Sequence, residues 1–207
     1  MAEDLATLLR DIRACRVCRD AALFPPALAH EPKPVLRASV TARLCVAGQA
    51  PGTRVHASGV PFSDPSGARL RQWMGVSDAE FYDEARVAIV PMGFCFPGLD
   101  EKGGDLPPRR ECARTWHDRL FAALPNIELV LAVGRYAHAY HLKGARKKTL
   151  TETVRGWRDV YDPRAVRRII PLPHPSWRNT AWLKRNPWFE TELLPVLRAE
   201  VRALLGC

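Results

Sequence analysis

The stretch Arg-Leu-Cys-Val-Ala-Gly-Gln-Ala-Pro-Gly, residues 43–52, decides how this chain folds. Its first half, 43–47, has the short apolar pattern of a buried strand, and the strand stops at a loop running from Gly48 to Gly52. Glycines allow the backbone to approach a ligand closely, and the proline stiffens the turn. Amides exposed in such a loop bind an anion or the edge of a base, although most loops of this composition are plain turns.

Outward from this stretch, apolar strand-like runs alternate with helical patterns. Strands are expected at 43–47, 86–90, 127–133 and 166–172, and helices at 4–14, 66–74, 109–124, 134–142 and 187–205. The segments 24–37 and 96–108 are rich in proline or glycine and are expected to be irregular. This order predicts an α/β fold, a three-layer α/β/α sandwich with a central, mainly parallel four-stranded sheet. Such sheets bind ligands at the carboxyl ends of their strands.

Composition and charge narrow the class of protein. The chain has 207 residues, 47% of them hydrophobic, so residues 1–207 are expected to form one domain with a substantial core. No apolar run approaches the roughly 20 residues of a membrane span, and the N-terminal sequence Met-Ala-Glu-Asp lacks the order of a secretory signal. We therefore expect a cytoplasmic monomer. The net charge of +9 suits a polyanionic partner such as DNA or RNA.

Four of the six cysteines form a candidate metal-binding set. Cys15 and Cys18 make a CxxC pair, Cys95 follows the second expected strand, and Cys112 lies in the next helix. Four thiolates hold either zinc or a [4Fe–4S] cluster, and the spacing does not choose between them. Cys95 and Cys112 have an alternative interpretation as ordinary small buried residues. Cys45 lies inside a strand and is expected to be a core residue.

A second group of residues has the chemistry of a catalytic site. His174 begins the sequence His-Pro-Ser at the end of the fourth expected strand, where its ring can donate a hydrogen bond to a leaving group that gains negative charge. Phe62 lies in the polar segment after the loop 48–52 and can stack on an extruded base. Each residue alone is equally typical of a structural position: a lone histidine at a strand end, or a core phenylalanine.

Together these motifs resemble the iron–sulfur, family-four members of the uracil-DNA glycosylase superfamily. Gly-Gln-Ala-Pro-Gly at 48–52 is similar to the first family motif, and 59–62 with 66–70 are similar to the stretch that follows it. His-Pro-Ser at 174–176 resembles the second catalytic motif, and the four cysteines match the cluster ligands in order. The resemblance runs from about Cys15 to the C-terminal helix.

The resemblance implies a DNA glycosylase of base excision repair, which hydrolyses the N-glycosidic bond of a flipped damaged base. It implies a structural [4Fe–4S] cluster on Cys15, Cys18, Cys95 and Cys112. It also implies three roles near the base. His174 stabilises the departing base, Gln49 lines the catalytic pocket, and the base lies among Ala50, Pro51, Gly52 and Phe62. Where the family usually has an acidic residue, His56 is expected to join the catalytic set and to orient or deprotonate the water, and Asp64 is the other candidate for this step. DNA is expected to contact Ser176, Trp177, Arg178, Lys184 and Arg185.

Three positions depart from the family pattern. Gln49 replaces the usual Glu, His56 stands where an acidic residue is common, and Pro91 replaces the Asn that reads uracil. Uracil is the first expected lesion, and hypoxanthine, xanthine or a modified pyrimidine are alternatives. A DNA-binding sensor that recognises damage without cleaving, or that stays covalently attached, is an alternative of another class. A zinc-bound structural module is a third, but it leaves both catalytic motifs unexplained.

Overall fold

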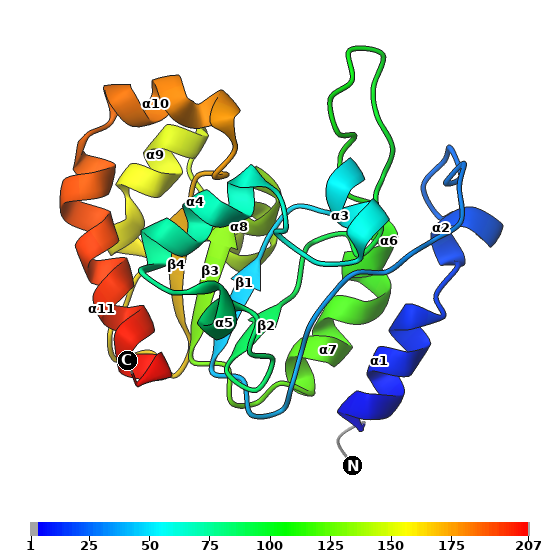
Figure 1. Cartoon of the computed structure of the whole chain (residues 1–207), viewed down its shortest axis with the longest axis horizontal. Helices are drawn as coiled ribbons and strands as arrows, with labels where there is room; N and C mark the ends of the chain where they lie inside the picture. Colours follow the sequence, from blue (N-terminus) through cyan, green and yellow to red (C-terminus); the bar gives the residue numbers. More distant parts are fainter. Residues whose placement is uncertain (1–3, 207) are drawn as a thin grey trace.

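A computed structural model describes residues 4–206. It has a four-stranded sheet between two layers of helices (Figure 1). The strands are β1 (Leu44–Ala47), β2 (Val87–Ile89), β3 (Leu129–Val133) and β4 (Arg168–Leu172). Their order across the sheet is β2-β1-β3-β4, and every neighbouring pair is parallel. The predicted α/β/α sandwich is confirmed, with a sheet that is parallel throughout.

All the expected helices are present, and several short ones are added. The helices are α1 (Leu5–Arg13), α2 (Val17–Asp20), α3 (Thr53–Ser58), α4 (Pro65–Met74), α5 (Asp78–Phe81), α6 (Arg110–Cys112), α7 (Asp118–Ala122), α8 (Arg135–His141), α9 (Leu150–Arg155), α10 (Thr180–Arg185) and α11 (Leu194–Leu205). The π-helical turn Ala113–His117 joins α6 to α7, and Phe189–Leu193 leads into α11. Among residues 4–206, no helix is both long and apolar enough to cross a membrane.

The two faces of the sheet bury different sets of side chains, because successive residues of a strand point to opposite sides. In β1, Leu44 and Val46 pack with α4, α5 and α11. Cys45 and Ala47 pack on the other face, with α1, α7 and α8. Both faces are covered, which explains why the strands read as continuous apolar runs rather than as alternating ones.

Caps visible in the sequence explain where several helices begin. The Asp64 side chain accepts the Gly67 amide at 3.1 Å, and Pro65 opens α4 with the backbone angle that the first helical turn requires. Ser77 with Glu80, and Thr149 with Glu152, form capping boxes at α5 and α9. The Asp64 cap matters for function, because it holds the start of α4 beside the carboxyl ends of the strands.

We predict that Gly67→Ala destabilises the protein, because the backbone of Phe62 leaves no room for a side chain at position 67. A methyl group placed on Gly67 would lie 1.7 Å from the Phe62 carbonyl oxygen, so the backbone must shift. Overpacking of this kind costs about 1–3 kcal/mol of unfolding free energy, measurable by urea denaturation. Gly144→Ala is the matched control, since nothing lies within 4 Å of its added methyl group. Equal stability of the two variants would contradict this packing.

Candidate active site

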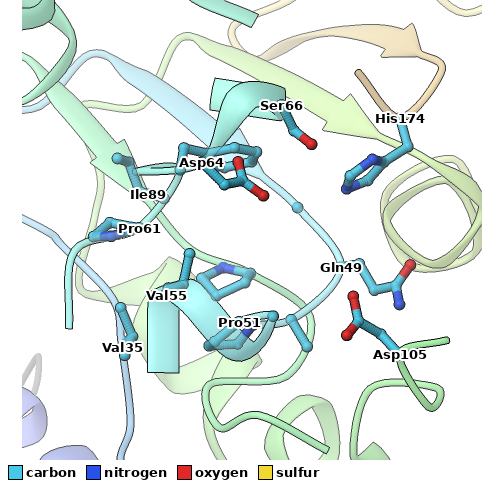
Figure 2. A pocket seen from close by; sticks show the side chains of 15 residues that line it. Val35, Gln49, Pro51, Val55, Pro61, Asp64, Ser66, Ile89, Asp105 and His174 are labelled. Atoms are coloured by element: carbon cyan, nitrogen blue, oxygen red, sulfur yellow. The ribbon is translucent and has the colours of Figure 1, made fainter. Parts of the chain in front are cut away.

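A cavity of about 70 Å³ lies at the carboxyl ends of β1 and β4 (Figure 2). Its walls come from segments that are far apart in the sequence. The lining residues are Val35, Gly48, Gln49, Ala50, Pro51, Gly52, Val55, Pro61, Phe62, Asp64, Ser66, Ile89, Pro91, Asp105 and His174. The fold therefore brings the loop 48–52, Phe62 and His174 into one pocket, at the edge of the sheet where ligands of parallel α/β folds bind.

The loop after β1 is held by two backbone hydrogen bonds to the chain after β2. The Met92 amide donates to the Gly48 carbonyl, and the Gly93 amide donates to the Gln49 carbonyl, both at 2.9 Å. These bonds bring Pro91 into the wall of the cavity. Proline offers no side-chain donor or acceptor, so Gln49 supplies the one amide side chain among the lining residues.

Phe62 lines the cavity in a strained backbone conformation, with φ at 54°. A non-glycine residue in this region costs about 1–3 kcal/mol and persists only where its surroundings hold it. Here the Phe62 carbonyl accepts hydrogen bonds from Arg71 Nη1 at 3.2 Å and from the Tyr82 hydroxyl at 3.1 Å. The ring meets Phe81 edge-on, with centroids 6.0 Å apart. Its neighbours therefore fix this aromatic ring at the pocket wall.

The ring of His174 points into the cavity from the loop after β4 (Figure 2). The Ser176 amide donates a hydrogen bond to His174 Nδ1 at 3.3 Å. A ring nitrogen that accepts a hydrogen bond is unprotonated, so the neutral imidazole carries its proton on Nε2. Asn179 Nδ2 donates to the His174 carbonyl at 2.7 Å, and Arg69 Nη1 donates to the Ser176 carbonyl at 3.0 Å. These bonds hold the loop and the orientation of the ring.

The charge on His174 follows from its surroundings. Burial lowers the pKa of His174 below its ordinary value, and the carboxylates of Asp64 and Asp105 offset only part of that shift. An ordinary histidine titrates near ~6.5, so the lowered pKa leaves His174 mainly neutral at pH 7. The group facing the pocket is therefore a neutral N–H donor.

Two aspartates on separate segments of the chain, Asp64 and Asp105, line the cavity. Asp64 caps α4, as described above. Asp105 comes from the long loop between β2 and α6, and a methyl group placed on Gly52 would lie 3.4 Å from Asp105 Oδ2. Sequence reasoning missed Asp105, because it belongs to no motif and only the fold returns its loop to the pocket. Its one visible signal was an acidic residue in a glycine- and proline-rich loop.

His56, the residue expected to handle water, is not among the lining residues. Its ring packs instead against His30 and Phe96, with centroids 5.1 and 5.5 Å away. The reason is helical geometry: one step along α3 turns a side chain by about 100°, and Val55 takes the direction that faces the cavity. Asp64 and Asp105 are thus the titratable groups that accompany His174 in the wall.

The residues expected to contact DNA lie outside the cavity. Trp177 is 76% exposed and follows His174 in the turn Trp177–Asn179, and Arg178 beside it is also exposed. Ser176 is half-buried in the same loop. Lys184 and Arg185 are exposed in the last turn of α10. These side chains occupy the surface that continues from the His174 loop.

The four cysteines of the expected metal site line a second, smaller cavity. They come from the end of α1, from α2, from the chain after β2 and from α6. The other lining residues are Ile12, Val17, Pro34, Phe94, Glu111 and Trp116. Cys45 is fully buried in β1 and is not part of this cavity, so its predicted place in the core is confirmed.

Hydrogen-bond donors already approach two of these sulfurs. Trp116 Nε1 donates to Cys15 Sγ at 3.3 Å, and the Phe94 amide donates to Cys112 Sγ at 3.4 Å. A hydrogen bond with Cys95 lowers the pKa of Cys18 to about 7. Four sulfurs that line one cavity, two of them with N–H partners, fit a thiolate-bound centre. Within residues 4–206, however, no three Cys, His, Asp or Glu side chains form a group that could hold a metal ion.

Comparison with known protein families matches residues 37–198 to the uracil DNA glycosylase superfamily. The chain belongs to this superfamily. It is therefore a DNA glycosylase, a hydrolase of N-glycosyl bonds that acts on DNA. The match contains every cavity-lining residue except Val35, so nearly the whole pocket lies within the matched region. It begins after Cys15 and Cys18, so half of the cysteine set lies outside the matched region.

Proposed function

We propose that this glycosylase removes uracil or a closely related base from DNA, with His174 stabilising the base as it leaves. The observation that carries the proposal is the His174 ring in a pocket that also holds Phe62 and the loop 48–52, with its Nδ1 accepting the Ser176 amide so that Nε2 is the nitrogen left to carry the proton. When the N-glycosidic bond breaks, negative charge develops on the base. A preorganised donor in a partly dry site stabilises that charge without reorganising at the moment of reaction.

The neutral state of His174 suits this role. A charged imidazolium would be attracted to the carboxylates of Asp64 and Asp105, which would compete with the base for its N–H groups. A neutral N–H makes one directed hydrogen bond to a base oxygen. Since burial lowers the pKa of His174, the neutral donor persists as pH falls below 7, until the pH reaches that lowered pKa.

The pocket walls limit which base is held. Phe62 supplies an aromatic surface on which a base can stack, and Gln49 supplies one amide with both a donor and an acceptor. At position 91, the proline side chain offers the base an apolar contact and no amide hydrogen bond. Uracil is the first candidate, and hypoxanthine, xanthine and modified pyrimidines are the alternatives that this less discriminating wall admits.

The exposed surface beside the pocket suits the duplex. A base leaves the stack only if something fills its place, and the exposed ring of Trp177 or the side chain of Arg178 is positioned to do so. Lys184 and Arg185, with Ser176, are the proposed phosphate contacts. The net charge of +9 supports such binding.

We further propose that the chain is a family-four enzyme whose four cysteines hold a structural [4Fe–4S] cluster. The shared cavity and the N–H bonds to Cys15 and Cys112 support this assignment. A single zinc ion needs its ligands within about 2.0–2.3 Å, whereas a [4Fe–4S] cluster spreads its thiolates over four iron atoms. The resemblance of the four cysteines, in their order along the chain, to the cluster ligands of the family-four enzymes favours the cluster over zinc.

Excision from a panel of oligonucleotides tests the proposed function. Protein purified without air is incubated with strands carrying uracil, hypoxanthine, xanthine or a 5-modified pyrimidine, and the released base is identified by mass spectrometry. We expect release of uracil or of one of these related bases, with an abasic site left in the strand. Tight binding without release, or a covalent protein–DNA adduct on a denaturing gel, would instead support a damage sensor or a trapping protein.

Cysteine substitutions test the cluster. We predict that wild-type protein is brown and contains iron, and that Cys95→Ser loses both because Cys95 lines the cysteine cavity. Cys45→Ser is the matched control, a buried cysteine outside that cavity, and should keep its iron. The measurements are iron and sulfide content and the visible absorption spectrum. A colourless protein with stoichiometric zinc would contradict the assignment.

A further inference from the structure

Neither the loop 48–52 nor the segment 174–176 supplies a carboxylate that could activate the attacking water. His56 faces away from the pocket, and Gln49 has an amide in place of a carboxylate. Hydrolysis still needs a water that is held in line with the sugar carbon and loses a proton. Two carboxylates reach the cavity, so the question is which of them is free to serve.

Asp105 is carried by a short, well-braced ribbon, residues 98–106, which rises above the sheet (Figure 1). The Asp100 amide donates to the Gly104 carbonyl at 2.8 Å, and the Leu106 amide donates to the Gly98 carbonyl at 3.0 Å. Asp100 Oδ1 accepts the amides of Lys102 and Gly104 at 2.9 and 2.8 Å, which closes the tip. The ribbon therefore presents Asp105 at a fixed place.

Asp105 lines the cavity beside Gly52 and is also exposed to solvent, so it lies at the mouth of the cavity. Figure 2 shows the Asp105 carboxylate beside the Gln49 side chain, on the opposite side of the pocket from Asp64. A base that enters the pocket leaves its sugar at the mouth. Asp105 is thus near the expected position of the sugar, while His174 is near the base.

The charges around Asp105 favour a group that can accept a proton. Burial raises the pKa of Asp105 above its ordinary value, and the negative charges of Asp64 and Asp100 act in the same direction. Arg178 and His174 face it as well and lower its pKa, which leaves a net increase. A carboxylate with a raised pKa is a stronger base than an ordinary aspartate.

Asp64 is less suited to this step, because one of its oxygens is committed to the structure. Its Oδ1 caps α4 through the Gly67 amide at 3.1 Å, at the turn that also holds Phe62. Among residues 4–206, no donor is found for the carboxylate of Asp105, so both of its oxygens are available to a water molecule.

We propose that Asp105 is the general base that orients and deprotonates the attacking water. This inference rests on the proposed function and adds the residue that completes it. The water oxygen forms a bond to C1′ of the deoxyribose while the bond from C1′ to the base nitrogen breaks. The electron pair of that bond leaves with the base, where the Nε2–H of His174 stabilises it. The water proton passes to the Asp105 carboxylate and then to solvent.

Single-turnover excision by Asp105→Asn tests the inference, with a uracil oligonucleotide as the probe and a hypoxanthine oligonucleotide in parallel. We expect the chemical step to slow by about 10²–10⁴-fold, the usual contribution of a general base. DNA affinity, measured by fluorescence anisotropy, should be unchanged or tighter because a negative charge leaves the mouth. Glu101→Gln is the matched control, since it removes one negative charge from the same ribbon at its exposed tip, and it should keep the wild-type rate.

The pH profile separates a base from a structural residue. In the wild type, the rate should fall as pH falls through the raised pKa of Asp105, since the protonated acid cannot accept a proton. Asp105→Asn should lack this acid limb at its lower rate. A wild-type rate in Asp105→Asn, or an acid limb that disappears in Asp64→Asn instead, would overturn the inference and leave the proposed function intact. A wild-type protein that excises no base would overturn both.

Discussion

The parallel pairing of β1, β3 and β4 is the constraint on which the rest of the site depends. Val46 pairs with Leu131, and Leu131 pairs with Ile170, so the three strands run in step and end at the same edge of the sheet. The loop 48–52 follows the first of these ends and His174 follows the last. A slip of one residue would exchange the faces of a strand, so burial on both sides keeps the register and with it the distance between the two motifs.

In the pocket at that edge of the sheet, the neutral His174 and the carboxylates of Asp64 and Asp105 occupy different parts of the wall. In the proposed mechanism, the neutral N–H donor of His174 faces the base that gains negative charge, and the carboxylates face the water and the sugar that gains positive charge. The apolar wall at Pro91 and the strained, firmly held Phe62 shape the space for the base between them. The cysteine cavity lies elsewhere, between α1, α2 and α6, and the cluster proposed there would join the N-terminal segment to the domain.

Much of this arrangement could be predicted from the sequence, because it follows from local patterns. Apolar runs placed all four strands, and the motifs at 48–52 and 174–176 indicated the pocket at their ends. Short helices such as α3 and α10 were missed, since six residues carry too little periodicity to register. The direction in which the His56 side chain points depends on the rotation of α3 about its axis. The position of Asp105 in the pocket depends on the path of the long loop between β2 and α6. No local sequence pattern encodes either of these.

In the proposed mechanism, His174 acts on the leaving base and not on DNA binding. The most direct measurement is the single-turnover excision rate of His174→Ala, compared with its affinity for the same oligonucleotide. We expect a rate lower by about 10²–10³-fold, the usual loss for one such donor, with affinity nearly intact because other residues are proposed to contact the phosphates. Full activity in His174→Ala on the best substrate would contradict it.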